Sequence, residues 1–170
     1  FAKASNGNRF ERKDFAETMT RLALQYISSE MIRERITQVT TTTRMQIVSA
    51  VARGFNDGLG QAGVASYISG LVPSLAGNRA ALIARTETHG AANAGSHSAA
   101  EETGLQLRRE WIAAEDERTR EAHAEANEQI VGMDEPFIVG GEALMYPGDP
   151  AGSAEAVINC RCTVGYIVDE

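Results

Sequence analysis

The segment from Arg79 to Glu102 carries the longest helical pattern in this chain and constrains its fold more than any other. It is rich in alanine, and Gly104, a residue type that commonly ends helices, follows it. Asn78 stands directly before it, where its side chain is suited to cap the first turn. We therefore expect one long helix that packs against a small sheet.

The segments before this helix also have helical patterns. Apolar residues recur with a period near 3.6 over residues 14–36, and residues 41–55 repeat the pattern. Thr40–Thr43 are weak in a helix interior, so this run predicts a helix start or a break. Glycines then end that helix, and a short helix follows, ending before Pro73.

The pattern changes after Gly104. Residues 105–114 alternate partly between apolar and polar, which predicts a strand, and the polar residues 115–131 predict a turn and a short helix. Residues 136–154 predict strands around a Gly-Gly hairpin, followed by a rigid loop. Residues 160–168 predict a closing strand.

These patterns predict an α+β fold. A helical N-terminal region, residues 1–76, precedes a small α+β domain, residues 77–170, whose long helix packs on a short, mainly antiparallel sheet. Charge divides the chain in a similar way: the first 80 residues carry ten Lys and Arg against six Asp and Glu, and residues 81–170 carry six against seventeen. No apolar run approaches the roughly 18 residues that span a membrane.

This charge distribution bears on nucleic-acid binding. The acidic second half is a poor candidate for binding phosphates by bulk electrostatics. The mildly basic first half could contact nucleic acid or an acidic partner, although a solvated helix surface is the favoured interpretation. The residues that would bind DNA are Arg12, Lys13, Arg33, Arg35 and Arg44.

The two cysteines of the chain, Cys160 and Cys162, are separated by one residue. On a strand their Cα atoms would lie about 6.5–7 Å apart, at the edge of disulfide reach, so we expect thiols in a reducing cytoplasm. A zinc ion needs about four ligands, and His123 would be the third, with Asp116 or His97 as the fourth. Buried thiols without a metal are the favoured interpretation, and a catalytic cysteine is less favoured, since no oxyanion pocket is visible.

Polar side chains recur around the predicted long helix and the segments after it. Arg85 and His89 are four residues apart and share a helix face, whereas Glu87 points elsewhere. A buried arginine needs a carboxylate or carbonyl partner, so we expect an ion pair that locks the helix to the sheet, with an anion or nucleotide clamp as the alternative. The residues expected in this structural network are Arg85, Glu87, Asp116, Arg118, Arg120, His123, Asn159 and Arg161.

Three segments of the chain, taken in order, resemble one protein family. They read "RAALIARTETHGAANAG", "WIAAEDERTREAHAEANEQIV" and "EPFIVGGEALMYPGDPAGSAEAVINCRC". The series resembles the Mu F-like head-morphogenesis proteins, the minor head proteins of tailed bacteriophages, over about residues 40–168. Many relatives carry Asp-Gly after the histidine where this chain has "EANEQ", so the turn there is expected to differ. The matching positions are Arg85, Thr86, Glu87, Trp111, Asp116, Arg118, Thr119, Arg120, His123, Pro147, Asp149, Asn159, Cys160, Arg161 and Cys162.

The resemblance implies a structural protein of the virion, present in few copies inside the capsid at the portal vertex and assembled in the host cytoplasm. Its implied partners are the portal protein or other head proteins, and packaged double-stranded DNA. Its implied roles are head assembly, DNA packaging and DNA delivery. The resemblance implies no established active site, so we expect no enzyme, and no cofactor unless the cysteines bind zinc.

Two alternatives to the structural head protein stay open, and the first is an enzyme or a toxin-associated module. The family domain also occurs fused to toxin modules or portal proteins, which fits a chain that begins at Phe1. An enzyme would be either ADP-ribosyltransferase-like, with Arg85, Glu87 and His123 around a nucleotide, or a zinc-dependent hydrolase. The second alternative is a virion protein that binds DNA without sequence preference.

Overall fold

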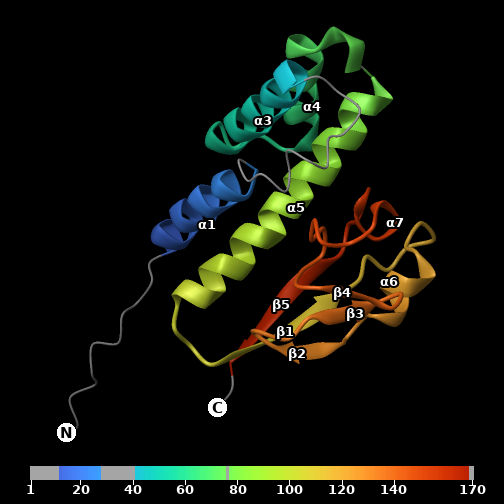
Figure 1. Ribbon diagram of the computed structural model, residues 1–170. Coiled ribbons are helices and arrows are strands. Elements are labelled where there is room, and N and C mark those ends of the chain that lie inside the picture. The colour runs from blue at the N-terminus through green and yellow to red at the C-terminus, as the bar shows by residue number, and fades with distance from the viewer. Residues whose placement is uncertain (1–11, 28–40, 76, 169–170) are drawn as a thin grey trace, which may run out of the picture.

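The computed structural model describes residues 12–27, 41–75 and 77–168, and its larger helices come first in the chain (Figure 1). The threonine run opens the second of these helices, and the third ends before Pro73, as predicted. Most of the second half of the predicted helix over residues 14–36 lies outside the described residues. The larger helices, with one short 3₁₀ helix, are α1 (Arg12–Ile27), α3 (Thr41–Asn56), α4 (Gln61–Leu71), η1 (Pro73–Leu75) and α5 (Asn78–Glu102).

Helix α5 begins one residue earlier than the sequence pattern predicts. Asn78 is its first residue, and Gly77, with φ at 71°, precedes it without a side-chain cap. The prediction that Asn78 caps the helix was therefore wrong, because the chain enters α5 through a backbone conformation that only glycine adopts readily. After the helix, Gly104 adopts φ 65°, as expected for a residue that ends a helix.

The strands after α5 confirm the α+β fold class. The strands β1 (Leu107–Ile112), β2 (Ile130–Gly132) and β5 (Thr163–Val168) form an antiparallel sheet in the order β2-β1-β5. A separate hairpin joins β3 (Phe137–Val139) to β4 (Glu142–Leu144). Its turn is Gly140–Gly141, with φ at 59° and 83°, as the Gly-Gly pair predicts.

Short elements in the second half differ from the predictions. Helix α6 (Glu121–Glu125) follows the predicted turn, but β2 and helix α7 (Ala154–Val157) were not predicted, because three or four residues carry no readable period. Cys160 and Cys162 lie in the loop between α7 and β5. The prediction that they share a strand face was wrong, since the strand begins only at Thr163.

Helix α5 runs between two packed groups of residues (Figure 1). On one side it contacts α1, α3 and α4, and its alanines join the apolar core of those helices. On the other side it contacts β5, beyond which a second core forms around Trp111 and Phe137. The division at residues 76 and 77 stays a prediction, because α5 shares its packing between the two groups. None of the helices in the described part of the chain combines the length and apolar character needed to cross a membrane.

Candidate functional site

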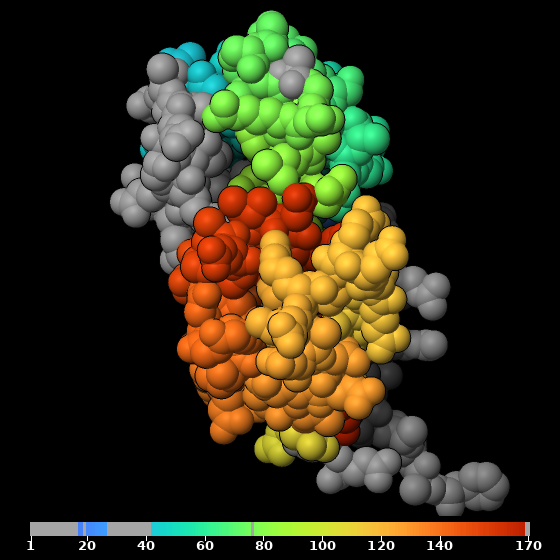
Figure 2. Space-filling view, turned by 90° about the vertical axis from the view of Figure 1, so that its right-hand side faces the viewer, coloured from blue at the N-terminus to red at the C-terminus, as the bar shows by residue number. Residues whose placement is uncertain are grey.

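An arginine-rich cavity of about 380 Å³ lies where α5, the loop before α6 and the loop before β5 meet. In Figure 2 the red segment before β5 lies between the green helical end and the yellow to orange part of the molecule. Of the six arginines in residues 81–170, four line this cavity, so positive charge collects there in the acidic half of the chain. The lining residues are Arg85, Arg118, Arg120, Arg161, His123, Asn159, Cys160, Cys162, Ala114 and Thr119.

The N-terminal half of α5 forms one wall of the cavity and binds the loop before β5. Arg85 donates to the Asn159 side-chain oxygen at 3.0 Å, and the Asn159 backbone N–H donates to Thr86 Oγ1 at 3.2 Å. Asn159 adopts φ 59°, a conformation that asparagine tolerates better than most residues. The expected ion pair of a buried Arg85 is therefore corrected: the side chain is half-buried and its partner is an amide.

His89, one turn further along the same helix face, also contacts this loop. Its Nε2 lies 2.6 Å from the carbonyl oxygen of Cys162, and because a carbonyl only accepts, the histidine donates. Burial lowers the pKa of His89, since desolvation disfavours the charged ring. Arg85 and His89 thus fasten both ends of the Asn-Cys-Arg-Cys segment to α5.

Asp116 does not line the cavity itself but binds Arg161, which does. Its two carboxylate oxygens accept from the guanidinium of Arg161, and Arg118 contributes a backbone N–H at 2.9 Å. The Arg161 hydrogen bonds hold the pKa of Asp116 well below its usual range. The sequence suggested Asp116 as a zinc ligand, but the structure commits both of its oxygens to arginine.

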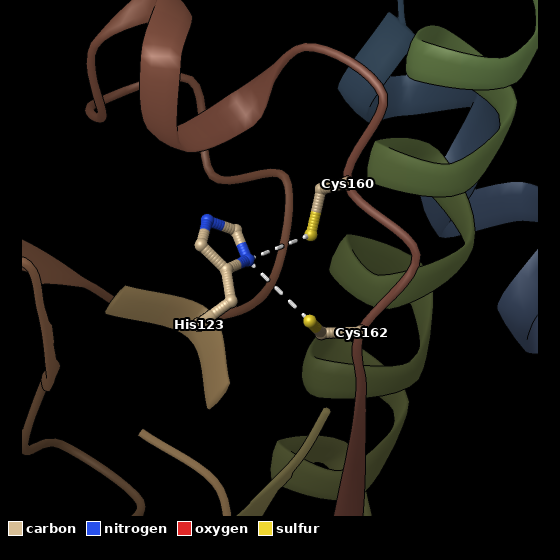
Figure 3. A group of neighbouring side chains, drawn as sticks. All are labelled: His123, Cys160 and Cys162. Atoms are coloured by element: carbon tan, nitrogen blue, oxygen red, sulfur yellow. Dashed lines mark hydrogen bonds between the residues drawn. The ribbon is translucent and has the colours of Figure 1, made fainter. Parts of the chain in front are cut away.

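His123 and the two cysteines meet at the floor of the cavity (Figure 3). The His123 Nδ1 atom lies 3.4 Å from the Cys162 Sγ atom and 3.7 Å from the Cys160 Sγ atom, and all three side chains are buried. The Trp111 ring packs edge-on against the histidine at 5.7 Å between centroids. The pKa of the Cys162 thiol is lowered, chiefly because the Cys160 thiol donates a hydrogen bond to it, and His123 adds a further donor.

Arg120 approaches the other nitrogen of the His123 ring. Its Nη1 lies 3.2 Å from Nε2, and its guanidinium also donates to the carbonyls of Ala156 and Ile158. Because arginine only donates, Nε2 accepts, and the ring proton of the neutral histidine is then on Nδ1, facing the sulfurs. This arrangement joins α6 to the segment around α7.

Several predicted site residues do not line the cavity or fall outside the described residues. Glu87 is buried on α5 and is not among the residues that line the cavity. Arg33 and Arg35 lie outside the described residues. Among the other predicted DNA-binding positions, Arg44 is half-buried on α3, whereas Arg12 and Lys13 open α1. DNA binding by these residues stays a prediction.

Sequence reasoning missed Asn93, which holds the loops against α5. Its Nδ2 donates to the carbonyls of Pro147 at 3.0 Å and Cys162 at 3.3 Å, and its Oδ1 accepts from Thr163 Oγ1 at 3.3 Å. The side chain is buried among small residues. An amide in the middle of an alanine-rich helix was the available signal, since a buried amide needs several partners.

His97, suggested as a fourth zinc ligand, lies on α5 away from the cysteines. Its ring is buried, packs on Tyr146 at 5.6 Å between centroids, and lies 3.6 Å from a Glu101 oxygen. Burial lowers its pKa, and the charge of Arg109 adds to the effect. His97 therefore belongs to the packing between α5 and the loop after β4.

The lowered pKa of His97 predicts a loss of stability in mild acid. The unfolded chain binds a proton near the ordinary value of about 6.5, whereas the folded chain resists it, so the free energy of unfolding should fall as pH drops below that value. Urea unfolding of the wild type and of His97→Gln at pH 7.5 and 5.5 measures this. The variant should lose less stability over the interval, and an equal loss would contradict the prediction.

The residues around the cavity lie in a part of the chain that matches a known protein family. The sequence model of the family described as "Phage Mu protein F like protein" matches residues 45–165, most of the chain, including every residue that lines the cavity. The chain belongs to this family. The resemblance noted from three sequence segments is thereby confirmed.

Relatives of this Mu F-like chain carry different names. The chain is 37% identical over 128 residues to "Minor head protein GP7" of Bacillus phage SPP1, covering 72% of this chain and 40% of that protein. It is 26% identical over 146 residues to "NAD(+)--arginine ADP-ribosyltransferase EFV" of Enterococcus faecalis, covering 84% of this chain and 30% of that protein. The chain thus spans less than half the length of these relatives. No solved structure matches it.

Proposed function

We propose that this chain is part of a structural minor head protein of a tailed phage or prophage-like particle, acting at the portal vertex in head assembly, DNA packaging or DNA delivery. One observation carries the proposal: the family match extends across the helices and the strand-bearing part, and the SPP1 relative is named a minor head protein. The implied location is the virion, after assembly in the host cytoplasm.

The contacts around the cavity support a structural role. Asp116 binds Arg161 across 45 residues of sequence, and Arg85 binds Asn159 across 74. Arg120 donates to the backbone before β5. Charge-assisted hydrogen bonds of this kind fix separate segments in one arrangement, as a protein that is assembled into a particle requires.

We place the contact with the portal protein or other head proteins on the helices before α5. These helices expose apolar side chains, with Met45 at 65% and Leu71 at 46% relative exposure. Apolar side chains on a surface are favourable contacts for a partner protein, because burying them removes apolar area from water. Packaged DNA is the second proposed partner, through the basic first half of the chain.

Particle composition tests this proposal. Heads purified from a host that carries the encoding phage or prophage should contain this protein in far fewer copies than the major capsid protein, as quantitative mass spectrometry measures. The double variant Met45→Glu and Leu71→Glu should lower the incorporated amount by about tenfold, the scale of a lost interface contact. The matched variant Ile138→Glu, at a 53% exposed position on β3, should be incorporated normally.

Two results would count against the proposal. Heads that never contain the protein would remove the head function itself. Equal incorporation of the double variant and the wild type would leave the function but move the contact away from the exposed residues of α3 and α4.

We do not extend the transferase name of the enterococcal relative to this chain. The chain covers 30% of that protein, and the nucleotide cleft suggested by Arg85, Glu87 and His123 would need all three side chains around one space. Arg85 and His123 line the cavity, but Glu87 does not. The observations favour the head protein over an ADP-ribosyltransferase or a hydrolase.

A further inference from the structure

We propose that His123, Cys160 and Cys162 bind one divalent metal ion of the zinc type. The fourth ligand of this ion would be a water molecule or an anion that enters through the arginine-lined cavity. The proposal rests on the geometry of these side chains and stands independently of the head function. Figure 3 shows the imidazole of α6 directed toward both sulfurs of the loop before β5.

The separations of the three ligand atoms suit a tetrahedral zinc ion. Zinc bonds of about 2.0–2.1 Å to nitrogen and about 2.3 Å to sulfur, at a tetrahedral angle, place these atoms about 3.6 Å apart. The observed distances from His123 Nδ1 are 3.4 Å to Cys162 Sγ and 3.7 Å to Cys160 Sγ. All three ligand atoms lie within 4.8 Å of one another, so an ion can contact them with little movement.

The donor set and its burial also favour zinc. One imidazole nitrogen and two thiolate sulfurs are ligands that zinc takes in preference to magnesium or calcium. The three residues come from two separate segments, and their exposed fractions are 3% or less. A metal would therefore tie α6 to the loop before β5 inside the second core.

The fourth position would open into the cavity. In the described part of the chain no further His, Cys, Asp or Glu joins the three ligands, and Asp116 is bound to Arg161. His123, Cys160 and Cys162 all line the cavity, together with Arg85 and Arg118. Zinc sites with three protein ligands keep a position for water or an added ligand, and the arginines would favour an anion there.

Arg120 and a bound metal need the ring proton of His123 on different nitrogens. Its donation to Nε2 needs the ring proton on Nδ1, but a metal on Nδ1 needs that proton on Nε2. Metal binding therefore requires Arg120 Nη1 to leave the ring, while the guanidinium keeps its bonds to the carbonyls of Ala156 and Ile158. Arg120→Gln should remove this competition, because a carboxamide oxygen accepts from Nε2–H.

The first experiment uses the whole chain, purified with a phosphine reductant. Elemental analysis after gel filtration should find about one zinc per chain, and a chelator should remove it and lower the thermal midpoint. Replacement by Co²⁺ should give thiolate-to-cobalt absorption, which here can arise only from Cys160 and Cys162, the two cysteines of the sequence. Inorganic phosphate should change the visible Co²⁺ bands if the fourth position is open.

Variants then assign the ligands. Cys162→Ser and His123→Gln should weaken Co²⁺ binding at least about tenfold, whereas the matched buried histidine variant His97→Gln should bind normally. Arg120→Gln should tighten binding by about tenfold, on the scale of changes next to a metal ligand. The chelator experiment on the wild type shows whether the chain binds a metal ion even if a ligand variant does not fold.

Three outcomes would overturn parts of the proposal. Metal below a tenth of an ion per chain, without cobalt–thiolate absorption, would leave a hydrogen-bonded thiol–imidazole cluster in place of a metal site. Visible Co²⁺ bands that do not change when inorganic phosphate is added would show that the fourth position is closed. Weaker binding by Arg120→Gln would contradict ligation through His123 Nδ1.

Discussion

Replacing Arg109 by methionine should lower the free energy of unfolding by about 3–5 kcal/mol, the scale for breaking a buried charged network. Arg109 is fully buried on β1. It donates to the Gly132 carbonyl from Nε at 3.2 Å and from Nη2 at 2.9 Å, and to the carbonyls of Met145 and Glu135. Methionine keeps much of the volume but leaves three carbonyls without this donor, at about 1–3 kcal/mol for each buried group left unsatisfied.

The neighbouring arginine supplies a matched control. Arg108 lies on the opposite, exposed face of the same strand, so Arg108→Met should change the free energy of unfolding by no more than about 0.5 kcal/mol. Urea unfolding followed by circular dichroism measures both variants. A loss below about 1 kcal/mol for Arg109→Met would contradict this prediction and would show that water replaces the guanidinium.

Replacing Gly148 by alanine should cost about 2–4 kcal/mol, because two penalties act at one position. Gly148 has φ at 85°, which is strained for a residue with a side chain. An added Cβ would also meet the Gly90 Cα atom of α5 at 2.9 Å. The loop after β4 would have to move away from α5, which weakens the Asn93 bond to Pro147 and the Tyr26 bond to the Gly148 carbonyl.

Gly104→Ala separates these two penalties. Gly104 has φ at 65°, but an added Cβ there would have no neighbour within 4 Å, so only the backbone strain of about 1 kcal/mol applies. The difference between the two variants therefore measures the close approach of Gly148 to α5. Equal losses in thermal unfolding would show that this approach contributes nothing.

Much of the candidate site could be read from the sequence. Arg85, Arg120, His123 and the two cysteines stand out because arginine, histidine and cysteine are rare among the alanines and turn residues around them. Their meeting at one cavity could not be read, since the contacts join residues between 36 and 74 positions apart. The partner of Arg85 was mistaken for this reason: a carboxylate was the expected type, and the fold supplies Asn159.

The sequence by itself determined the features that depend on neighbouring residues. The long helix, to within one residue at its start, the Gly-Gly hairpin, and the change from helices to short strands after Gly104 follow from local periodicity and turn chemistry. The grouping of Arg118, Arg120 and His123 within six residues was equally visible.

Only the tertiary structure decided which of these residues share a space. It buries Arg109 under three carbonyls, directs Asn93 to two loops, and brings His123 to within about 4 Å of two sulfurs. The physical reason is that a buried polar group takes its partners from whichever backbone segment packs against it. Packing depends on the whole chain, whereas a helix or a turn depends on a few successive residues.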